Sequence, residues 1–230
     1  SRGVGLETAK CFAKSGFIVY ATVRNLPEKN EKNVQFIELD LLDTTSIEKT
    51  VQHIVDRHGR IDVLINNAGY ALVGPLELLT EEQIHDQMEV NFFAPIRCIK
   101  AVLPTMREQK SGRIINISST NAFGTPPFGG LYAASKSALE SLSESLRIEV
   151  EPYHIFVSIV EPGLLQTQFG LTLGMRHVSD HSYDATMKVI SSEIEERRAH
   201  PEKLSPSQTP QEIGAFLLSI AQESHPKLRY

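Results

Sequence analysis

A tyrosine and a lysine stand four positions apart, at Tyr132 and Lys136, in the stretch GLYAASKSALESLSESL of residues 130–146. Apolar residues recur through this stretch with helical spacing, so both side chains are expected on one face of a helix. An ammonium beside a phenol favours the phenolate, because it stabilises the negative charge. The pair could therefore exchange a proton with a carbonyl or alcohol oxygen. The ordinary alternative is a surface helix whose lysine lies along an aromatic ring.

Glycines that could approach a phosphate open the chain. Gly3 and Gly5 in SRGVG directly precede an apolar helical pattern. A helix N-terminus offers free N–H groups and partial positive charge, and glycine leaves the backbone bare for a pyrophosphate. Two glycines before a helix also make an ordinary tight turn, so this signal is weak when taken alone.

Arginines at two separate places indicate which dinucleotide would bind. Arg24 follows the apolar run FIVYATV, and Arg2 lies in the glycine turn. An acidic residue at the first position would bind the ribose of NAD, whereas an arginine can pair with the 2′-phosphate of NADP. Two solvated surface arginines are the alternative. The pair favours NADP(H).

Two further stretches lie where strands are expected to end. Asp40 follows NVQFIEL and could accept a hydrogen bond from an adenine amino group, or it could simply cap a loop or helix. Asn66–Gly69 reads NNAG, in which asparagines brace the backbone and Ala68 and Gly69 leave room for a cofactor.

Strand and helix patterns alternate along the chain. Apolar strand-like runs cover residues 17–24, 33–43, 61–69, 112–119 and 155–163, and helical patterns lie between them at residues 44–59, 81–108 (interrupted near Pro95) and 131–150. This alternation predicts βαβ crossovers and a doubly wound, mostly parallel sheet, a Rossmann-type αβα sandwich. Because ligands bind at the carboxyl ends of such strands, the residues named above are expected at one edge.

Residues 1–230 are expected to form a single dinucleotide-binding catalytic domain. Residues 164–210 lose clear periodicity apart from a helix near 184–199, and they are interpreted as a substrate-loop insertion. A last helix begins after Thr209 with Pro210 at its first position. The chain starts without methionine in a glycine turn and stops at HPKLRY, so a first strand and most of a last strand are expected outside this sequence.

Composition narrows the class of function. Of the 230 residues, 41% are apolar and 22% charged, and the net charge is −5, which offers no general attraction for nucleic acid. No apolar run is long enough for a membrane span. Cys11 and Cys98 have no CxxC spacing, and His177 and His181 have no nearby third ligand, so neither a disulfide nor a metal is expected. A cytoplasmic location is expected.

Taken together, these motifs resemble the short-chain dehydrogenase/reductase family, in the branch of 17β-hydroxysteroid and retinol dehydrogenases. The resemblance spans nearly the whole chain: part of the glycine turn, NNAG, an asparagine in the next helix, a serine, YxxxK, and a PG turn with a later threonine. It implies the catalytic residues Asn91, Ser119, Tyr132 and Lys136. It implies a cofactor site of Ser1, Arg2, Gly3, Gly5, Arg24, Asp40, Leu41, Asn67, Ala68, Gly69, Tyr132, Lys136, Pro162, Gly163, Leu165 and Thr167.

The resemblance also implies a reaction, hydride transfer between NADP(H) and a ketone, an aldehyde or a secondary alcohol. Tyr132 would donate the proton, Lys136 would lower the pKa of Tyr132 and bind the nicotinamide ribose, Ser119 would hold the substrate oxygen, and Asn91 would position a relay water. A carbonyl reductase working as a homodimer or homotetramer is the expected form.

Alternatives remain open. One is an epimerase or dehydratase relative, although little sequence follows Gly163 for a second domain. Another is a nucleotide-sensing protein of the same fold without catalysis. The substrate is expected to be apolar, a steroid, retinoid or aliphatic compound, because apolar residues that could equally be core packing gather at Pro127, Phe128, Leu164, Leu165, Phe169, Leu171, Leu173 and Met175.

Overall fold

The valine- and isoleucine-rich runs form five short strands in the computed structural model, which describes residues 3–27, 31–163, 165, 182–200 and 208–230. Branched side chains suit strands that are buried on both faces. The strands are β1 Val19–Val23, β2 Val34–Glu38, β3 Val63–Asn66, β4 Gly112–Ile117 and β5 Ile155–Val160.

Helices precede β1, lie between β2, β3, β4 and β5, and follow β5. The α-helices are α1 Gly3–Lys14, α2 Thr44–His58, α3 Glu81–Met88, α4 Ala94–Gln109, α5 Gly130–Val150, α6 Asp184–Ala199 and α7 Pro210–Gln222. Three short 3₁₀ turns, Leu76–Leu78, Thr120–Ala122 and Glu151–Tyr153, and one π-helical turn, η2 Glu89–Phe93, complete the described elements. Capping boxes begin α3 at Thr80 and α7 at Thr209, the latter as predicted.

The sheet is parallel throughout its described part. β1 pairs with β2, and β3, β4 and β5 pair in that order. Leu228 and Tyr230 add backbone hydrogen bonds beside β5, on both sides of Ile159, so the chain there runs as a further parallel strand. Helices join β3 to β4 and β4 to β5, whereas a loop joins β1 to β2, and the parallel pairing confirms the predicted α/β class.

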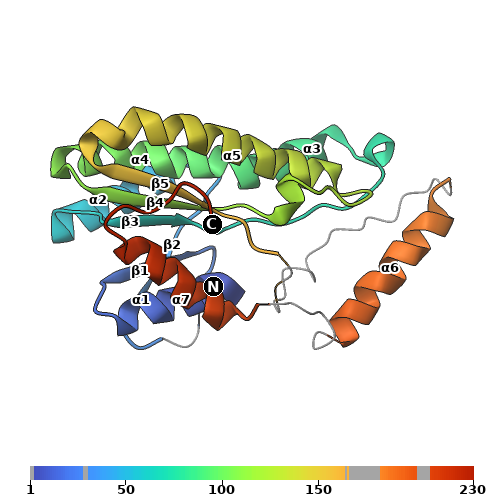
Figure 1. Ribbon diagram of the computed structural model, residues 1–230, viewed down its shortest axis with the longest axis horizontal. Helices are drawn as coiled ribbons and strands as arrows, with labels where there is room; N and C mark the ends of the chain where they lie inside the picture. The colour runs from blue at the N-terminus through green and yellow to red at the C-terminus, as the bar shows by residue number, and fades with distance from the viewer. Residues whose placement is uncertain (1–2, 28–30, 164, 166–181, 201–207) are drawn as a thin grey trace.

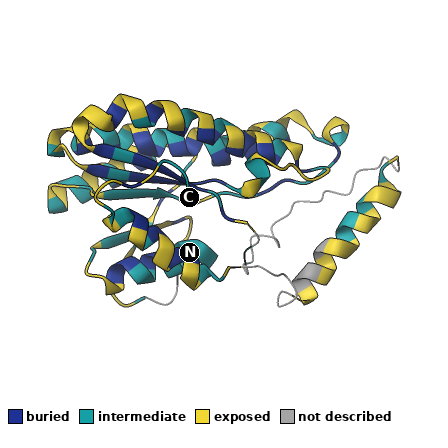
Figure 2. Ribbon diagram, in the orientation of Figure 1, coloured by how far each residue is buried: buried dark blue, intermediate teal, exposed yellow. Residues whose placement is uncertain are grey.

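Two layers of helices cover the strands. In Figure 1, α2, α4 and α5 lie on one face, and α1 and α7 lie on the other. Alternate residues of β4 serve the two faces: Ile114 packs with α4 and α5, whereas Ile115 and Ile117 pack with α1 and α7. Figure 2 shows the buried residues concentrated between these layers. This three-layer, single-domain arrangement is of the Rossmann type.

A cavity of about 690 Å³ lies between β1 and β3. Residues of both strands line it, along with apolar side chains of α1, α2 and α4. Within the described part of the chain, β1 and β3 share no backbone pairing. Asn66, Asn67 and Ala68 line the cavity as well, but Tyr132 and Lys136 do not.

The predicted break near Pro95 is the π-helical turn η2, which ends at Phe93, and Pro95 lies in the first turn of α4. One predicted boundary was wrong. Strand β2 ends at Glu38, because the chain then turns with Asp43 N donating to Asp40 O at 3.2 Å. Asp40 therefore lies in a turn after the strand.

The predicted substrate insertion, residues 164–210, is described only in part. Its helix α6 matches the predicted range 184–199, and Leu165 pairs with Gln208 in an isolated parallel bridge. Residues 164, 166–181 and 201–207 lie outside the described part, and so do the predicted residues Ser1, Arg2 and Thr167. Among the described residues, no helix has the length and apolar character needed to cross a bilayer.

Candidate active site

Tyr132 and Lys136 lie in the first two turns of α5, on the face packed against the strands. Only 5% of Tyr132 and 4% of Lys136 is exposed. The ammonium nitrogen of Lys136 lies 5.9 Å from the centre of the Tyr132 ring. The same nitrogen donates a 2.8 Å hydrogen bond to the carbonyl of Ile117, the last residue of β4. The helix therefore presents both groups, as predicted, to the carboxyl end of the sheet.

Ser119 brings a hydroxyl to Tyr132. It follows β4 by two residues, and its oxygen also accepts from the N–H of Asn121 at 3.2 Å, which starts the 3₁₀ turn at Thr120. The N–H of Thr120 in turn donates to the carbonyl of Pro162 at 3.2 Å. These contacts fix the serine between the end of β4 and the Pro162–Gly163 turn after β5.

Burial dominates the proton affinities of the pair. It raises the pKa of Tyr132, and the hydrogen bond with Ser119 lowers that pKa to a smaller degree. Burial lowers the pKa of Lys136 to about 8, and the charge of Glu140 opposes this shift. The expected lowering of the Tyr132 pKa by Lys136 is thus not the main effect here. Burial therefore separates the two pKa values, with the phenol above its ordinary value and the ammonium below it.

Asn91 lies in the π-helical turn η2 and is fully buried. Its side-chain oxygen accepts from Tyr70 N at 3.1 Å, and its amide nitrogen donates to Tyr70 O at 2.9 Å and to the Ser135 hydroxyl at 3.0 Å. Both amide hydrogens are thereby used. The oxygen can accept one more hydrogen bond, so a water held by Asn91 would have to donate to it.

Gly69 explains why the NNAG sequence ends in glycine. A Cβ atom at this position would lie 3.1 Å from the Asn91 oxygen and 3.4 Å from the Lys136 nitrogen. The first distance is tighter than ordinary contact, so only glycine lets the chain pass this close to the catalytic candidates. Asn66 adds a brace, because its amide donates to the Asn116 side chain at 2.8 Å across β3 and β4.

The cofactor candidates lie at the start of α1 and in the segments that follow β1, β2 and β3. Gly3 starts α1 with a positive φ of 59°, and Gly5 lines the cavity. Arg24 is exposed directly after β1. Asn67 and the exposed Ala68 follow β3.

The turn after β2 holds two further candidates, Asp40 and Leu41. The Asp40 carboxylate accepts from Leu42 N at 2.9 Å, so the loop-capping alternative is realised there. Leu41 packs against the cluster of Leu39, Ile47 and Cys98. Its carbonyl accepts a hydrogen bond from Arg97 at 3.5 Å.

These residues fit a nicotinamide dinucleotide. A helix N-terminus opened by glycine suits a pyrophosphate, and a buried lysine with two unused N–H groups suits sugar hydroxyls. The tight approach at Gly69 leaves the backbone bare beside Lys136. By contrast, no group of three or more potential metal ligands occurs among the described residues.

The sequence motifs did not include some residues that contact the site. Gln87 lies one turn before Asn91, accepts from Leu72 N at 2.7 Å and donates to Tyr70 O at 2.8 Å. Its helical spacing from Asn91 was a usable signal. Glu140, one turn beyond Lys136, was equally visible by spacing, but its partner Arg229 is 89 residues away in sequence.

Comparison with known proteins agrees with this geometry. Residues 1–175 match the family model described as short chain dehydrogenase. The chain belongs to the short-chain dehydrogenase family. The match covers more than half of the sequence and includes every catalytic candidate.

Three relatives show which members of the family this chain is similar to. It is 38% identical to a 3-ketodihydrosphingosine reductase of Bacteroides thetaiotaomicron, with 100% of this chain and 83% of the relative aligned. It is 35% identical to human retinol dehydrogenase 8, over 100% and 78% of the two chains. It is 31% identical to human 17-beta-hydroxysteroid dehydrogenase type 1, over 100% and 74%. The predicted branch is confirmed.

A solved structure supports the fold. A metagenomic short-chain oxidoreductase in complex with NADP superposes with a TM-score of 0.75 over 100% of this chain and 90% of its own, at 23% identity. At this identity the likeness establishes the Rossmann-type fold alone.

Proposed function

We propose that this oxidoreductase transfers hydride between NADP(H) and a ketone, an aldehyde or a secondary alcohol on an apolar molecule. The observation that carries the proposal is the convergence of Tyr132, Ser119, Lys136 and Asn91 at one sheet edge. A phenol hydrogen-bonded to a hydroxyl, with a buried ammonium nearby, is an arrangement for moving a proton onto an oxygen.

Each residue has a role that follows from its contacts. When bound, the nicotinamide supplies or accepts the hydride at the carbon. In the reductive direction Tyr132 gives its proton to the carbonyl oxygen as the carbon gains the hydride, so the product is a neutral alcohol. Ser119 donates a hydrogen bond to the same oxygen, which stabilises negative charge as it develops there. Lys136 stabilises the phenolate left behind.

Lys136 and Asn91 then connect Tyr132 to solvent. Lys136 uses one N–H on the Ile117 carbonyl, which leaves two for ribose hydroxyls or a water. The Asn91 oxygen lies near the same nitrogen, because both approach the Cβ position of Gly69. A water between them could return a proton to Tyr132 after each turnover.

Support for NADP(H) comes from Arg24. Its guanidinium is exposed at the end of β1, where a dinucleotide's ribose is expected, and a 2′-phosphate is a bidentate partner for arginine. The NADP bound by a structural neighbour agrees with this choice.

Support for an apolar substrate comes from Phe128 and from the relatives. Phe128 adopts a positive φ of 61°, an uncommon state for a bulky residue, four residues before Tyr132. Its ring meets the Tyr183 ring edge-on at 5.9 Å, and this contact links it to the start of α6. The relatives are named for 3-ketodihydrosphingosine, retinol and a 17-beta-hydroxysteroid, molecules with a large hydrocarbon part and a ketone or hydroxyl group.

Replacing Tyr132 with phenylalanine tests the proposal. Tyr132→Phe should lower kcat by about a hundredfold or more, because the proton donor is lost, while NADPH binding measured by fluorescence stays close to wild type. The wild-type protein is first assayed with NADPH against a panel of aliphatic, steroid and retinoid carbonyls. Tyr153→Phe, a change in the 3₁₀ turn Glu151–Tyr153 beyond the end of α5, is the matched control. Normal turnover by Tyr132→Phe would overturn the assignment.

A further inference from the structure

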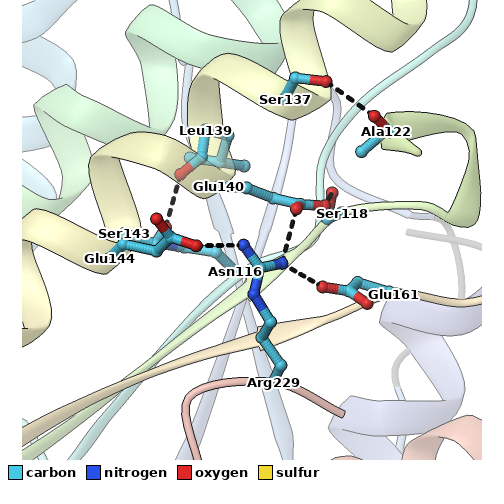
Figure 3. A network of polar contacts seen from close by, with 10 residues as sticks. All are labelled: Asn116, Ser118, Ala122, Ser137, Leu139, Glu140, Ser143, Glu144, Glu161 and Arg229. Carbon is cyan, nitrogen blue, oxygen red and sulfur yellow. Dashed lines mark hydrogen bonds and ion pairs between the residues drawn. The ribbon is translucent and has the colours of Figure 1, made fainter.

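Glu140 is a buried carboxylate beside the catalytic candidates. It lies one helical turn beyond Lys136 on α5, and only 4% of it is exposed. One carboxylate oxygen accepts a hydrogen bond from the Ser118 hydroxyl, and the other accepts from Arg229 at 2.7 Å (Figure 3). A charge buried to this degree is costly unless it is paired and hydrogen-bonded. These two partners therefore fix the position of the Glu140 carboxylate.

Arg229 gathers three carboxylates around one guanidinium. Besides Glu140 it pairs with Glu144, also on α5, and with Glu161, which directly follows β5 (Figure 3). These neighbours hold the pKa of Arg229 well above its ordinary value. The guanidinium also lies 5.5 Å from the centre of the Phe123 ring. Arg229 thus joins α5, the end of β5 and the loop after β4.

The same carboxylate reaches both halves of the catalytic cluster. Ser118 immediately precedes Ser119, and its N–H donates to Val160 O at 2.7 Å while its hydroxyl donates to Glu140. The residue before Ser119 is therefore fixed from two sides. On the helix, the charge of Glu140 raises the pKa of Lys136 against the effect of burial. Glu140 acts on the serine side and on the lysine side at once.

We propose that Glu140 and Arg229 are positioning residues, which hold Ser119 in place and keep Lys136 charged during proton transfer. Glu140 supplies the negative charge next to Lys136 and the acceptor for Ser118. Arg229 holds the Glu140 carboxylate in place through its other oxygen. The inference rests on the proposed function, because it assigns these residues to the same site.

The charged surroundings make the direction of the effect definite. Around Lys136 the described groups are Glu140 and the phenol of Tyr132 on α5, the uncharged Ile117 carbonyl from β4 and the amide of Asn91 from η2. Around Glu140 they are Lys136 and Glu144 on its own helix, Ser118 after β4, Glu161 after β5, and Arg229.

Removal of Arg229 leaves three carboxylates without their guanidinium. The Glu140 carboxylate then loses the hydrogen bond that fixes its position, and repulsion from Glu144 and Glu161 displaces it. Its negative charge then supports Lys136 less, so Lys136 gives up its proton at lower pH.

The test replaces each partner and follows Lys136 directly. The full chain is labelled at lysine Cε with ¹³C, the Lys136 signal is assigned with Lys136→Met, and its titration is recorded by NMR without added ligand. Glu140→Gln and Arg229→Met should each lower the pKa of Lys136 by about one unit. The double variant should shift it no further than either single variant, because both act through one charge.

Kinetics and controls complete the test. With NADPH and the carbonyl that the wild-type protein turns over best, the alkaline limb of kcat should move to lower pH in both variants. Glu144→Gln removes a half-exposed partner of the same guanidinium and should leave both readouts at wild-type values. Arg229→Lys should restore most of the Lys136 titration. If Arg229→Met does not fold, Glu140→Gln and Arg229→Lys carry the comparison.

Two outcomes would contradict different statements. An unchanged Lys136 titration in Glu140→Gln, or a shift equally large in Glu144→Gln, overturns the positioning role whatever the reaction is. Absence of turnover by the wild-type protein on every carbonyl of the panel overturns the proposed function instead. The NMR titration remains decisive in that case, since it needs no substrate.

Discussion

Tyr132 and Lys136 show how burial creates usable chemistry from two ordinary side chains. Burial disfavours the charged form of each, so it raises the pKa of the phenol and lowers the pKa of the ammonium. The neutral phenol is the form that donates a proton in reduction. The lysine, with a pKa of about 8, stays mostly charged at neutral pH and is able to stabilise the phenolate once it forms.

The lowered pKa of Lys136 predicts a dependence of stability on pH. An unfolded lysine keeps its proton up to a pKa of about 10.4, so between about pH 8 and that value the unfolded state binds more protons than the folded state. Stability should therefore rise with pH in this window, by about 1.4 kcal/mol for each unit. Below pH 8 both states are protonated and the contribution is constant.

Urea unfolding of wild type and Lys136→Met between pH 7 and pH 10 measures this contribution. The difference in free energy of unfolding, wild type minus variant, should grow above pH 8. Lys49→Met, a change at an exposed position on α2, should instead follow the wild-type slope. A constant difference between wild type and Lys136→Met across the range would show that the pKa of Lys136 is not lowered in the folded protein.

At the scale of elements, the contact of α1 with α7 sets the distance between two helices on one face of the sheet. Gly214 of α7 lies against the backbone of Glu7 and Thr8, and a Cβ there would approach those atoms to 3.1 Å. Backbone atoms of a packed helix cannot turn aside as a flexible side chain can. A larger residue must therefore push α1 and α7 apart, although a residue with better helix propensity partly offsets the cost.

Substitution of Gly214 should thus destabilise the fold. Gly214→Val is expected to cost about 1–3 kcal/mol, the usual range for overpacking, and Gly214→Ala less. Gly130→Ala, where a Cβ meets nothing within 4 Å, is the control and should be neutral or slightly stabilising. Denaturant midpoints with unchanged slopes would report this directly. A Gly214→Val protein as stable as wild type would mean that α1 and α7 can move apart without loss of stability.

Local patterns predicted these elements well and their ends less well. Helix α6 and the cap at Thr209 follow from periodicity and capping chemistry, which are properties of neighbouring residues. The π-helical turn at Glu89–Phe93 has no comparable signal, because a widened turn satisfies the contacts of Asn91 with Tyr70 and Ser135 rather than any local preference.

The candidate site divides in the same way. Residues at strand ends were predictable from the topology of a parallel sheet, because all such ends meet at one edge. The Arg229 cluster was not, since its carboxylates stand 68 to 89 residues before the arginine. Only the fold brings the segment 228–230 beside β5, so no motif on the sequence marks the pair.

For the molecule as a whole, the cofactor candidates are divided between two sheets. Gly5 and Arg24 belong to the side of β1, and Asn67, Gly69 and Pro162 belong to the side of β3–β5. A ligand that contacts both sides would therefore stabilise their arrangement, and its binding free energy appears as stability of the folded state.

Thermal unfolding in the presence of NADPH and NADH tests this coupling. At a concentration about 100 times the dissociation constant, NADPH should add about 2.7 kcal/mol of stability, seen as a higher Tm. Arg24→Asp should reduce the NADPH shift far more than the NADH shift, because a carboxylate repels the 2′-phosphate and can bind a ribose. Arg107→Asp, which makes the same change in charge at an exposed position on α4, should leave both shifts intact. Equal NADPH and NADH shifts in the wild-type protein, unaltered in Arg24→Asp, would show that Arg24 does not select the cofactor. No shift with either nucleotide would show that the cofactor candidates of the two sheets do not bind a dinucleotide together.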